Sequence, residues 1–242
     1  MTDAAIVTEW IDLKVGSAVM SAYVARPAEP GRYPGVVVGH EIYGLHDTAR
    51  AATDRLASLG AIAVLPDLFH RVAPRAELTL HVDRERGLEL LRTLNRPEVV
   101  DDISACLDEL RRRGAVSLNM VGFSAGGHVA YYAATQLPLA ATAAFYPGWL
   151  TNTDVPLSTP EPTVEATPGI TGRIALFFGG EDPLIDAEAR DELEAALSAN
   201  DIQHEIVVYD DAPHGFLFPG RDSYRPEFAE DSWTRLADLL RD

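Results

Sequence analysis

Short apolar runs alternate with longer amphipathic segments along the 242-residue chain, and this alternation restricts the fold more than any other feature. The runs have strand length, and most of the longer segments have the 3.6-residue periodicity of helices. We therefore expect an α/β fold with a mostly parallel sheet and helices on both faces. The expected strands are 6–13, 18–25, 35–39, 62–65, 117–122, 140–146, 174–178 and 204–209, and the expected helices are 46–59, 80–94, 98–113, 125–137, 187–199 and 225–240. No helix separates the first two strands, which predicts an antiparallel hairpin at one edge.

Length and composition favour a single domain over 1–242, because 47% of the residues are apolar and 24% are charged, as in an average globular protein. We find no internal repeat and no second domain boundary. Residues 148–172 are rich in Pro and Thr with few apolar anchors, which predicts a surface loop. A loop of this length either covers a site as a lid or is simply mobile.

The formal net charge of −17 argues against nucleic acid and anionic membranes as partners, because both need clustered basic side chains. The only cysteine, Cys106, falls on the apolar face of an expected helix, so no internal disulfide is possible. The start of the chain lacks a basic segment followed by a long apolar run, so we expect a cytoplasmic protein, either monomer or homodimer.

The segment SLNMVGFSAGGHVAYYAA reads as a buried strand, a tight turn at Ser124 and a helix. The G-x-S-x-G pattern alone is weak, but the strand before it and the helix after it make it specific for a nucleophile elbow. Gly122 and Gly126 leave room for the close passage from strand to helix. The alternative is that Ser124 merely caps the helix.

A serine nucleophile needs a base and an acid that orients the base, and on this kind of fold the chain order is Ser, Asp or Glu, then His. Asp182 in GGEDPLI and His214 in DDAPHGF each follow an expected strand, where open α/β sheets place their sites. Glu181 and Asp186 remain alternatives for the acid, since Asp182 could instead cap a helix.

The loop after the third strand, in VVVGHEIYGLHD, is expected to supply one backbone N–H of an oxyanion hole, and the residue after the nucleophile the other. This predicts Ile42 and Ala125 as donors. A zinc-binding H-E-x-x-H motif is ruled out because Gly44 stands where the second histidine would be. We expect neither a metal nor a cofactor.

These segments together resemble the dienelactone hydrolase family, and the matching stretches are GVVVGHEIYGL, VLPDLFHRVAP, MVGFSAGGHVAYYAA, LFFGGEDPLI and IVVYDDAPHGFLFPGRDSY. The resemblance implies an α/β-hydrolase fold with Ser124, Asp182 and His214 as the catalytic residues. It also implies that Glu41 faces the nucleophile.

The sequence departs from the family pattern in two respects. The enzyme that gives the family its name has a cysteine where this chain has Ser124, so the role of Glu41 is open. Family substrates carry a carboxylate bound by two arginines. Arg86 could match the first, with Arg84 as a rival, but Phe218 stands at the second position. Phe218 and Trp149 instead suggest an apolar pocket.

We therefore expect a serine hydrolase that cleaves small carboxylic esters or lactones through an acyl-enzyme. The alternatives are a peptidase or acyl-transfer enzyme on the same fold, or a binding protein that has lost the chemistry.

Overall fold

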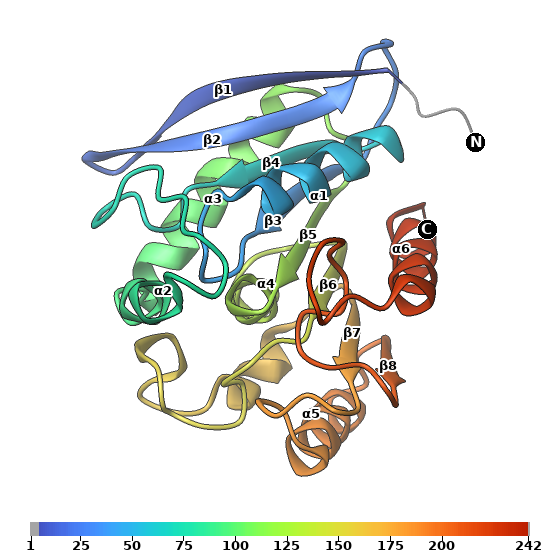
Figure 1. Ribbon diagram of the computed structural model, residues 1–242. Helices are drawn as coiled ribbons and strands as arrows, with labels where there is room; N and C mark the ends of the chain where they lie inside the picture. The colour runs from blue at the N-terminus through green and yellow to red at the C-terminus, as the bar shows by residue number, and fades with distance from the viewer. Residues whose placement is uncertain (1–4, 242) are drawn as a thin grey trace.

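An eight-stranded sheet forms the centre of the computed structural model, which describes residues 5–241 (Figure 1). Residues 1–4 and 242 of the expected domain lie outside the described residues. The strands are β1 (Ile6–Val15), β2 (Ala18–Pro27), β3 (Gly35–Gly39), β4 (Ile62–Pro66), β5 (Leu118–Phe123), β6 (Ala141–Phe145), β7 (Arg173–Gly179) and β8 (His204–Tyr209). The helices are α1 (Asp47–Ser58), α2 (Arg84–Leu91), α3 (Arg96–Arg112), α4 (Ala125–Gln136), α5 (Ala187–Ala199) and α6 (Pro226–Arg241).

The strand order is β1-β2-β4-β3-β5-β6-β7-β8, with the two N-terminal strands at one edge. β1 pairs antiparallel with β2, and β2 pairs antiparallel with β4, while all later neighbours pair in parallel. The expected α/β fold and the antiparallel edge hairpin are therefore confirmed. Because β3, β5, β6, β7 and β8 run in parallel, their carboxyl ends meet along one edge of the sheet.

Helices cover both faces of the sheet. α3 and α4 contact the central strands and each other, while α1 contacts β2 and β4, and α6 contacts β6 and β7. Arg55 of α1 forms an ion pair with Glu230 of α6 at 2.8 Å, so these two helices lie on the same face. Asn95 caps the start of α3, because its side chain accepts a hydrogen bond from the Glu98 amide. The buried face of α3 includes Cys106, as expected.

The segment 148–172 differs from the expected loop. It contains two short 3₁₀ helices, Pro156–Ser158 and Thr163–Gly169, and the second contacts α4. The expectation of few apolar anchors is wrong, because Leu150, Leu157 and Val164 are buried. Single apolar residues between prolines have no recognisable periodicity, although they fill gaps in the core.

The described residues contain no helix that is both long and apolar enough to cross a lipid bilayer.

Candidate active site

Ser124 lies at the sharp turn between β5 and α4, with φ 51° and ψ −114°. This backbone region is costly for a residue with a side chain, by about 1–3 kcal/mol, and persists only where the surroundings enforce it. The Ser124 amide donates to the Phe145 carbonyl at 2.9 Å, and no side-chain capping bond forms. The alternative that Ser124 serves as a helix cap is therefore not supported.

Glycines permit this turn by close backbone contact. A Cβ atom on Gly122 would lie 1.9 Å from the Gly126 carbonyl oxygen, and one on Gly126 would lie 2.1 Å from the Gly39 carbonyl oxygen. Side chains cannot be accommodated at such distances. The start of α4 is thus packed directly onto the ends of β3 and β5.

Three side chains from the ends of separate strands form a hydrogen-bonded chain. The Ser124 hydroxyl lies 2.9 Å from His214 Nε2, and His214 Nδ1 lies 2.7 Å from Asp182 Oδ2. Because an ionised carboxylate can only accept, Nδ1 carries the proton and Nε2 is free to accept from Ser124. The structure thus brings together the three residues expected from the sequence.

The geometry also separates Asp182 from its two alternatives. The Asp182 side chain is fully buried, and its second oxygen accepts from the Leu184 amide at 2.9 Å. Asp186 instead caps α5 by accepting from the Ala189 amide, and Glu181 is exposed. Of the three candidate acids, Asp182 is the one that forms a hydrogen bond with His214.

The two expected oxyanion donors lie beside the nucleophile. Ala125 is the first residue of α4, and Ile42 lines the same cavity as Ser124. Within residues 5–241, neither backbone amide donates to a protein acceptor. Both amides are therefore available to a substrate oxygen.

Glu41 is buried in the site and paired with an arginine that the sequence analysis missed. Arg221 donates to both carboxylate oxygens, at 3.0 and 2.5 Å, and also to Thr48 Oγ1 at 3.1 Å. The exposed fractions of the Glu41 and Arg221 side chains are 8% and 7%. Burial alone would lower the pKa of Arg221, but the charge and hydrogen bonds of Glu41 outweigh burial and raise it.

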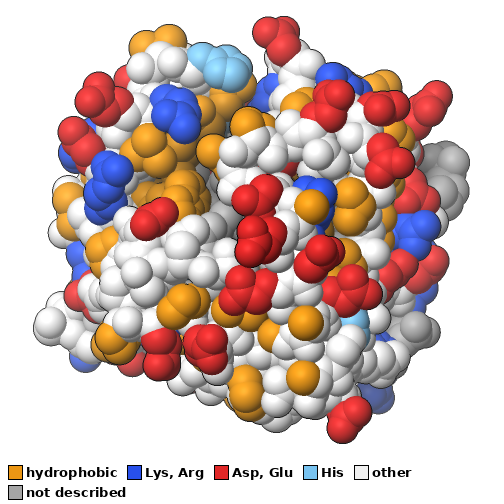
Figure 2. Space-filling view, turned by 90° about the horizontal axis from the view of Figure 1, so that it is seen from below, with side chains coloured by type: hydrophobic (Ala, Val, Ile, Leu, Met, Phe, Trp, Pro, Cys, Tyr) orange, Lys and Arg blue, Asp and Glu red, His pale blue; other side chains and the backbone are white. Residues whose placement is uncertain are grey.

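A cavity of about 510 Å³ opens at Ser124. Its apolar wall contains Ile42, Tyr43, Leu80, Leu88, Trp149, Pro183, Leu184 and Pro213, and its polar wall includes Glu41, Arg84, His214 and Arg221. Figure 2 shows a hollow of this kind, with hydrophobic side chains inside and histidine and basic side chains at its edge, on a surface rich in Asp and Glu. The lining thus contains two arginines, Arg84 and Arg221, and two acids, Glu41 and Asp222, of which Glu41 is paired with Arg221.

Two expected pocket residues are placed elsewhere. Arg86 is half-exposed and pairs with Glu89 at 2.8 Å, while its rival Arg84 lines the cavity. Two positions along a helix correspond to a rotation of about 200°, so the two arginines point to opposite sides of α2.

Phe218 also differs from its expected position. It is buried against Phe123, with ring centroids 5.1 Å apart, and does not line the cavity. The Arg221 guanidinium lies over the Phe218 ring at 4.7 Å, so Phe218 supports the arginine that was expected to be missing. Trp149, by contrast, lines the cavity as expected.

Tyr146 is a further residue that the sequence did not single out. It follows β6 with φ 39°, is fully buried, and packs edge-on against the His214 ring at 4.8 Å between centroids. Its hydroxyl has no hydrogen-bond partner within residues 5–241, and burial raises its pKa well above the usual value. Tyr146 therefore restricts the position of the His214 ring by packing.

The sheet topology, the turn at Ser124 and the hydrogen-bonded chain at the strand ends define an α/β-hydrolase fold. A sequence model of the dienelactone hydrolase family matches residues 20–242. The chain belongs to the dienelactone hydrolase family.

Relatives of similar length support this assignment. The Synechocystis protein named "Putative carboxymethylenebutenolidase" is 31% identical over 230 residues, covering 92% of this chain and 91% of the relative. A Bradyrhizobium protein named "Probable 2-oxo-3-(5-oxofuran-2-ylidene)propanoate lactonase" is 28% identical, covering 100% and 96%. The Klebsiella pneumoniae crystal structure named "Putative Dienelactone Hydrolase" superposes with a TM-score of 0.89 at 28% identity, covering 98% and 99%.

Proposed function

We propose that this protein is a serine hydrolase that cleaves small carboxylic esters or lactones through an acyl-enzyme on Ser124. The observation that carries this proposal is the continuous hydrogen-bonded chain from Asp182 through His214 to Ser124 at the opening of the cavity. The family of the chain and the names of its relatives agree with hydrolysis of lactone or ester bonds.

In the proposed mechanism, Ser124 Oγ attacks the substrate carbonyl carbon while His214 Nε2 takes the hydroxyl proton. The amides of Ile42 and Ala125 stabilise the negative charge on the carbonyl oxygen. Collapse of this intermediate breaks the ester bond, and the leaving oxygen takes the proton from His214. A water molecule, deprotonated by His214, then hydrolyses the acyl-enzyme and regenerates Ser124. Asp182 keeps His214 in the required tautomer throughout.

The Glu41–Arg221 pair supports His214 rather than Glu41 as the base. Both carboxylate oxygens of Glu41 accept hydrogen bonds from Arg221, whereas His214 directly contacts the Ser124 hydroxyl. Within residues 5–241, the Ser124 hydroxyl is hydrogen-bonded to His214 and makes no hydrogen bond with Glu41. We therefore assign Glu41 to holding Arg221 at the cavity wall.

We further propose that the preferred substrates carry a carboxylate. Arg84 and Arg221 both line the cavity although the chain has a net charge of −17, and Arg84 forms no ion pair within residues 5–241. The name of the Bradyrhizobium relative describes a lactone that carries a propanoate group. An anionic substrate would thus meet Arg84, which has no ion-pair partner within residues 5–241, next to an Arg221 whose charge is already balanced by Glu41.

The first test compares Ser124→Ala, Asp182→Asn and Asp186→Asn in hydrolysis of an activated ester. We expect Ser124→Ala to abolish turnover and labelling by a fluorophosphonate. We expect Asp182→Asn to lower kcat by about 10⁴-fold, as loss of the orienting carboxylate does in other serine hydrolases. Asp186→Asn is the matched control, because asparagine also caps helices and activity should be retained. Normal turnover by Ser124→Ala would refute the proposal.

The second test compares Arg84→Gln with Arg86→Gln, which remove the same charge from opposite sides of α2. For a carboxylate-bearing ester, Arg84→Gln is expected to lower kcat/KM about fivefold, corresponding to about 1 kcal/mol for an exposed ion pair. A neutral ester of the same size should be hydrolysed equally by both variants. Equal effects of the two substitutions on the anionic ester would contradict the proposed substrate class.

A further inference from the structure

His40 is a buried histidine that has no part in the proposed proton transfers. It follows β3 directly, is 1% exposed, and packs edge-on against Phe69 with ring centroids 4.8 Å apart. Its ring makes two hydrogen bonds, one to the Glu41 carbonyl at 2.7 Å through Nδ1 and one to the Leu68 amide at 3.2 Å through Nε2. Both partners are backbone groups, so the ring connects two separate loops.

These partners fix the tautomer of His40. A backbone amide can only donate, so Nε2 must accept from Leu68 and carries no proton. The proton is therefore on Nδ1, which donates to the Glu41 carbonyl. Burial lowers the pKa of His40, which keeps the ring neutral and preserves both hydrogen bonds.

The Glu41 carbonyl belongs to the same peptide group as the Ile42 amide. In a planar trans peptide the carbonyl and the N–H point in opposite directions, so fixing one fixes the other. The Glu41 carbonyl is held by His40 and by the Gly44 amide, which donates at 3.1 Å. On the other side, Gly87 of α2 approaches the Ile42 carbonyl so closely that an added Cβ would lie 2.7 Å from the oxygen.

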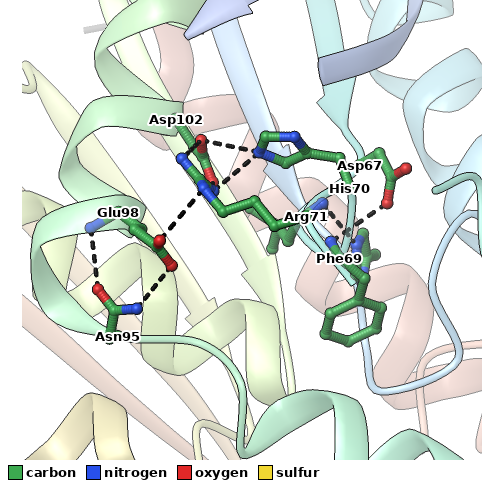
Figure 3. A network of polar contacts seen from close by, with 9 residues as sticks. Asp67, Phe69, His70, Arg71, Asn95, Glu98 and Asp102 are labelled. Carbon is green, nitrogen blue, oxygen red and sulfur yellow. Dashed lines mark hydrogen bonds and ion pairs between the residues drawn. The ribbon is translucent and has the colours of Figure 1, made fainter. Parts of the chain in front are cut away.

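The loop that holds His40 is itself attached to α3. His70 and Arg71 both bind the buried Asp102, with contacts of 3.1 Å for His70 and 2.7 and 2.9 Å for Arg71. Figure 3 shows this network together with Asp67, whose carboxylate accepts from the Phe69 amide. The Leu68 amide is therefore presented to His40 from a rigid support.

We propose that His40 is a positioning residue that aims the Ile42 amide into the oxyanion hole by holding the Glu41 carbonyl. This inference rests on the proposed serine hydrolase function, and it predicts that loss of the Nδ1 hydrogen bond weakens transition-state binding more than substrate binding. It requires no contact between His40 and the substrate.

The test compares His40→Asn with His40→Gln. The amide nitrogen of asparagine corresponds in position to Nδ1 and can donate to the Glu41 carbonyl. The amide of glutamine corresponds in position to Nε2, so it can accept from the Leu68 amide but does not replace the hydrogen bond to Glu41. We expect His40→Gln to lower kcat per titrated active site about 10- to 100-fold, with KM changed less than about threefold. Binding of a trifluoromethyl ketone, which forms a tetrahedral adduct on Ser124, should weaken by the same factor as kcat/KM. His40→Asn should recover most of the activity.

A role in folding alone would lower the number of active sites and the Tm in both variants, without changing kcat per site. An unchanged kcat in His40→Gln, or equal losses in the two variants, would overturn the inference. If neither variant folds, ¹⁵N NMR of the unmodified protein tests the proposal by showing which ring nitrogen of His40 carries the proton. A proton on Nδ1 with no titration between pH 5 and 9 supports the proposal, and a proton on Nε2 overturns it. Activity in Ser124→Ala would instead refute the proposed function itself.

Discussion

Replacing Glu41 by Gln tests whether the ion pair with Arg221 is desolvated. The two side chains are 8% and 7% exposed and share two hydrogen bonds, so the substitution leaves the Arg221 charge buried without its partner. Breaking a buried pair in this way costs about 3–5 kcal/mol. Because both residues also line the cavity, we expect the lower end, about 3 kcal/mol. For a chain of this size that corresponds to a Tm lower by about 6–12 °C.

The assay is urea unfolding of Glu41→Gln, Arg221→Met and the double variant. The double variant should be less destabilised than the sum of the single variants by about 2–3 kcal/mol, because it removes both charges from the interior. Glu89→Gln is the control, because its partner Arg86 is half-exposed, and the expected loss is within about 0.5 kcal/mol. High salt should reduce the small effect of Glu89→Gln while leaving that of Glu41→Gln unchanged.

A loss below about 1 kcal/mol in Glu41→Gln, or additive effects in the double variant, would refute this reasoning. Either result would mean that water in the cavity already solvates the pair. Arg221 would then be a mobile side chain rather than a fixed cation at the cavity wall.

Three further substitutions test particular contacts. Tyr146→Phe removes a buried hydroxyl that has no partner in the described part of the chain, so the free energy of unfolding should stay within about 1 kcal/mol of the parent and kcat within about twofold. A larger loss of stability would show that the hydroxyl is bonded. Burial lowers the pKa of His128 to about 3, so below pH 6.5 the unfolded chain takes up a proton there that the folded chain does not. Urea titrations from pH 6 to 4 should therefore show stability falling faster in the parent than in His128→Gln, by about 1.4 kcal/mol per pH unit, and parallel curves would contradict this. Gly122→Ala should prevent folding because its Cβ would lie 1.9 Å from the Gly126 carbonyl oxygen, whereas Gly148→Ala, with no atom within 4 Å, should express as folded protein.

The order of strands and helices was predictable because burial determines the residue pattern in each element. Strands buried on both faces read as continuous apolar runs, as in Gly35–Gly39, and the structure places all eight within a few residues of their expected ends. The segment 148–172 was not predictable in the same way. Its buried residues are separated by prolines and lie in 3₁₀ turns, where neither helical nor strand periodicity applies.

Ser124, Asp182 and His214 could be expected together because each follows a strand, and parallel strands end at one edge of the sheet. No such rule fixes the distance from His214 to a residue in the following loop. An arginine was sought four residues after His214, whereas Arg221 lies seven residues after it, beyond the turn at Gly220. The sequence did contain one indication of this arginine. Glu41 was expected to face an apolar site, and a buried carboxylate needs a cation as its partner.

The rigidity and the charge of the site have separate origins in the chain. The position of Ser124 depends on backbone contacts at Gly122 and Gly126, where no side chain fits, so the strain at its positive φ is held by the sheet and α4. The cations come instead from Arg84 at the start of α2 and from Arg221 in a surface loop. Since these two elements do not hold the elbow, substitutions in them should change the preferred substrate without moving the nucleophile. A shared backbone frame with variable loop charges is thus sufficient to explain how one such fold can accept different esters.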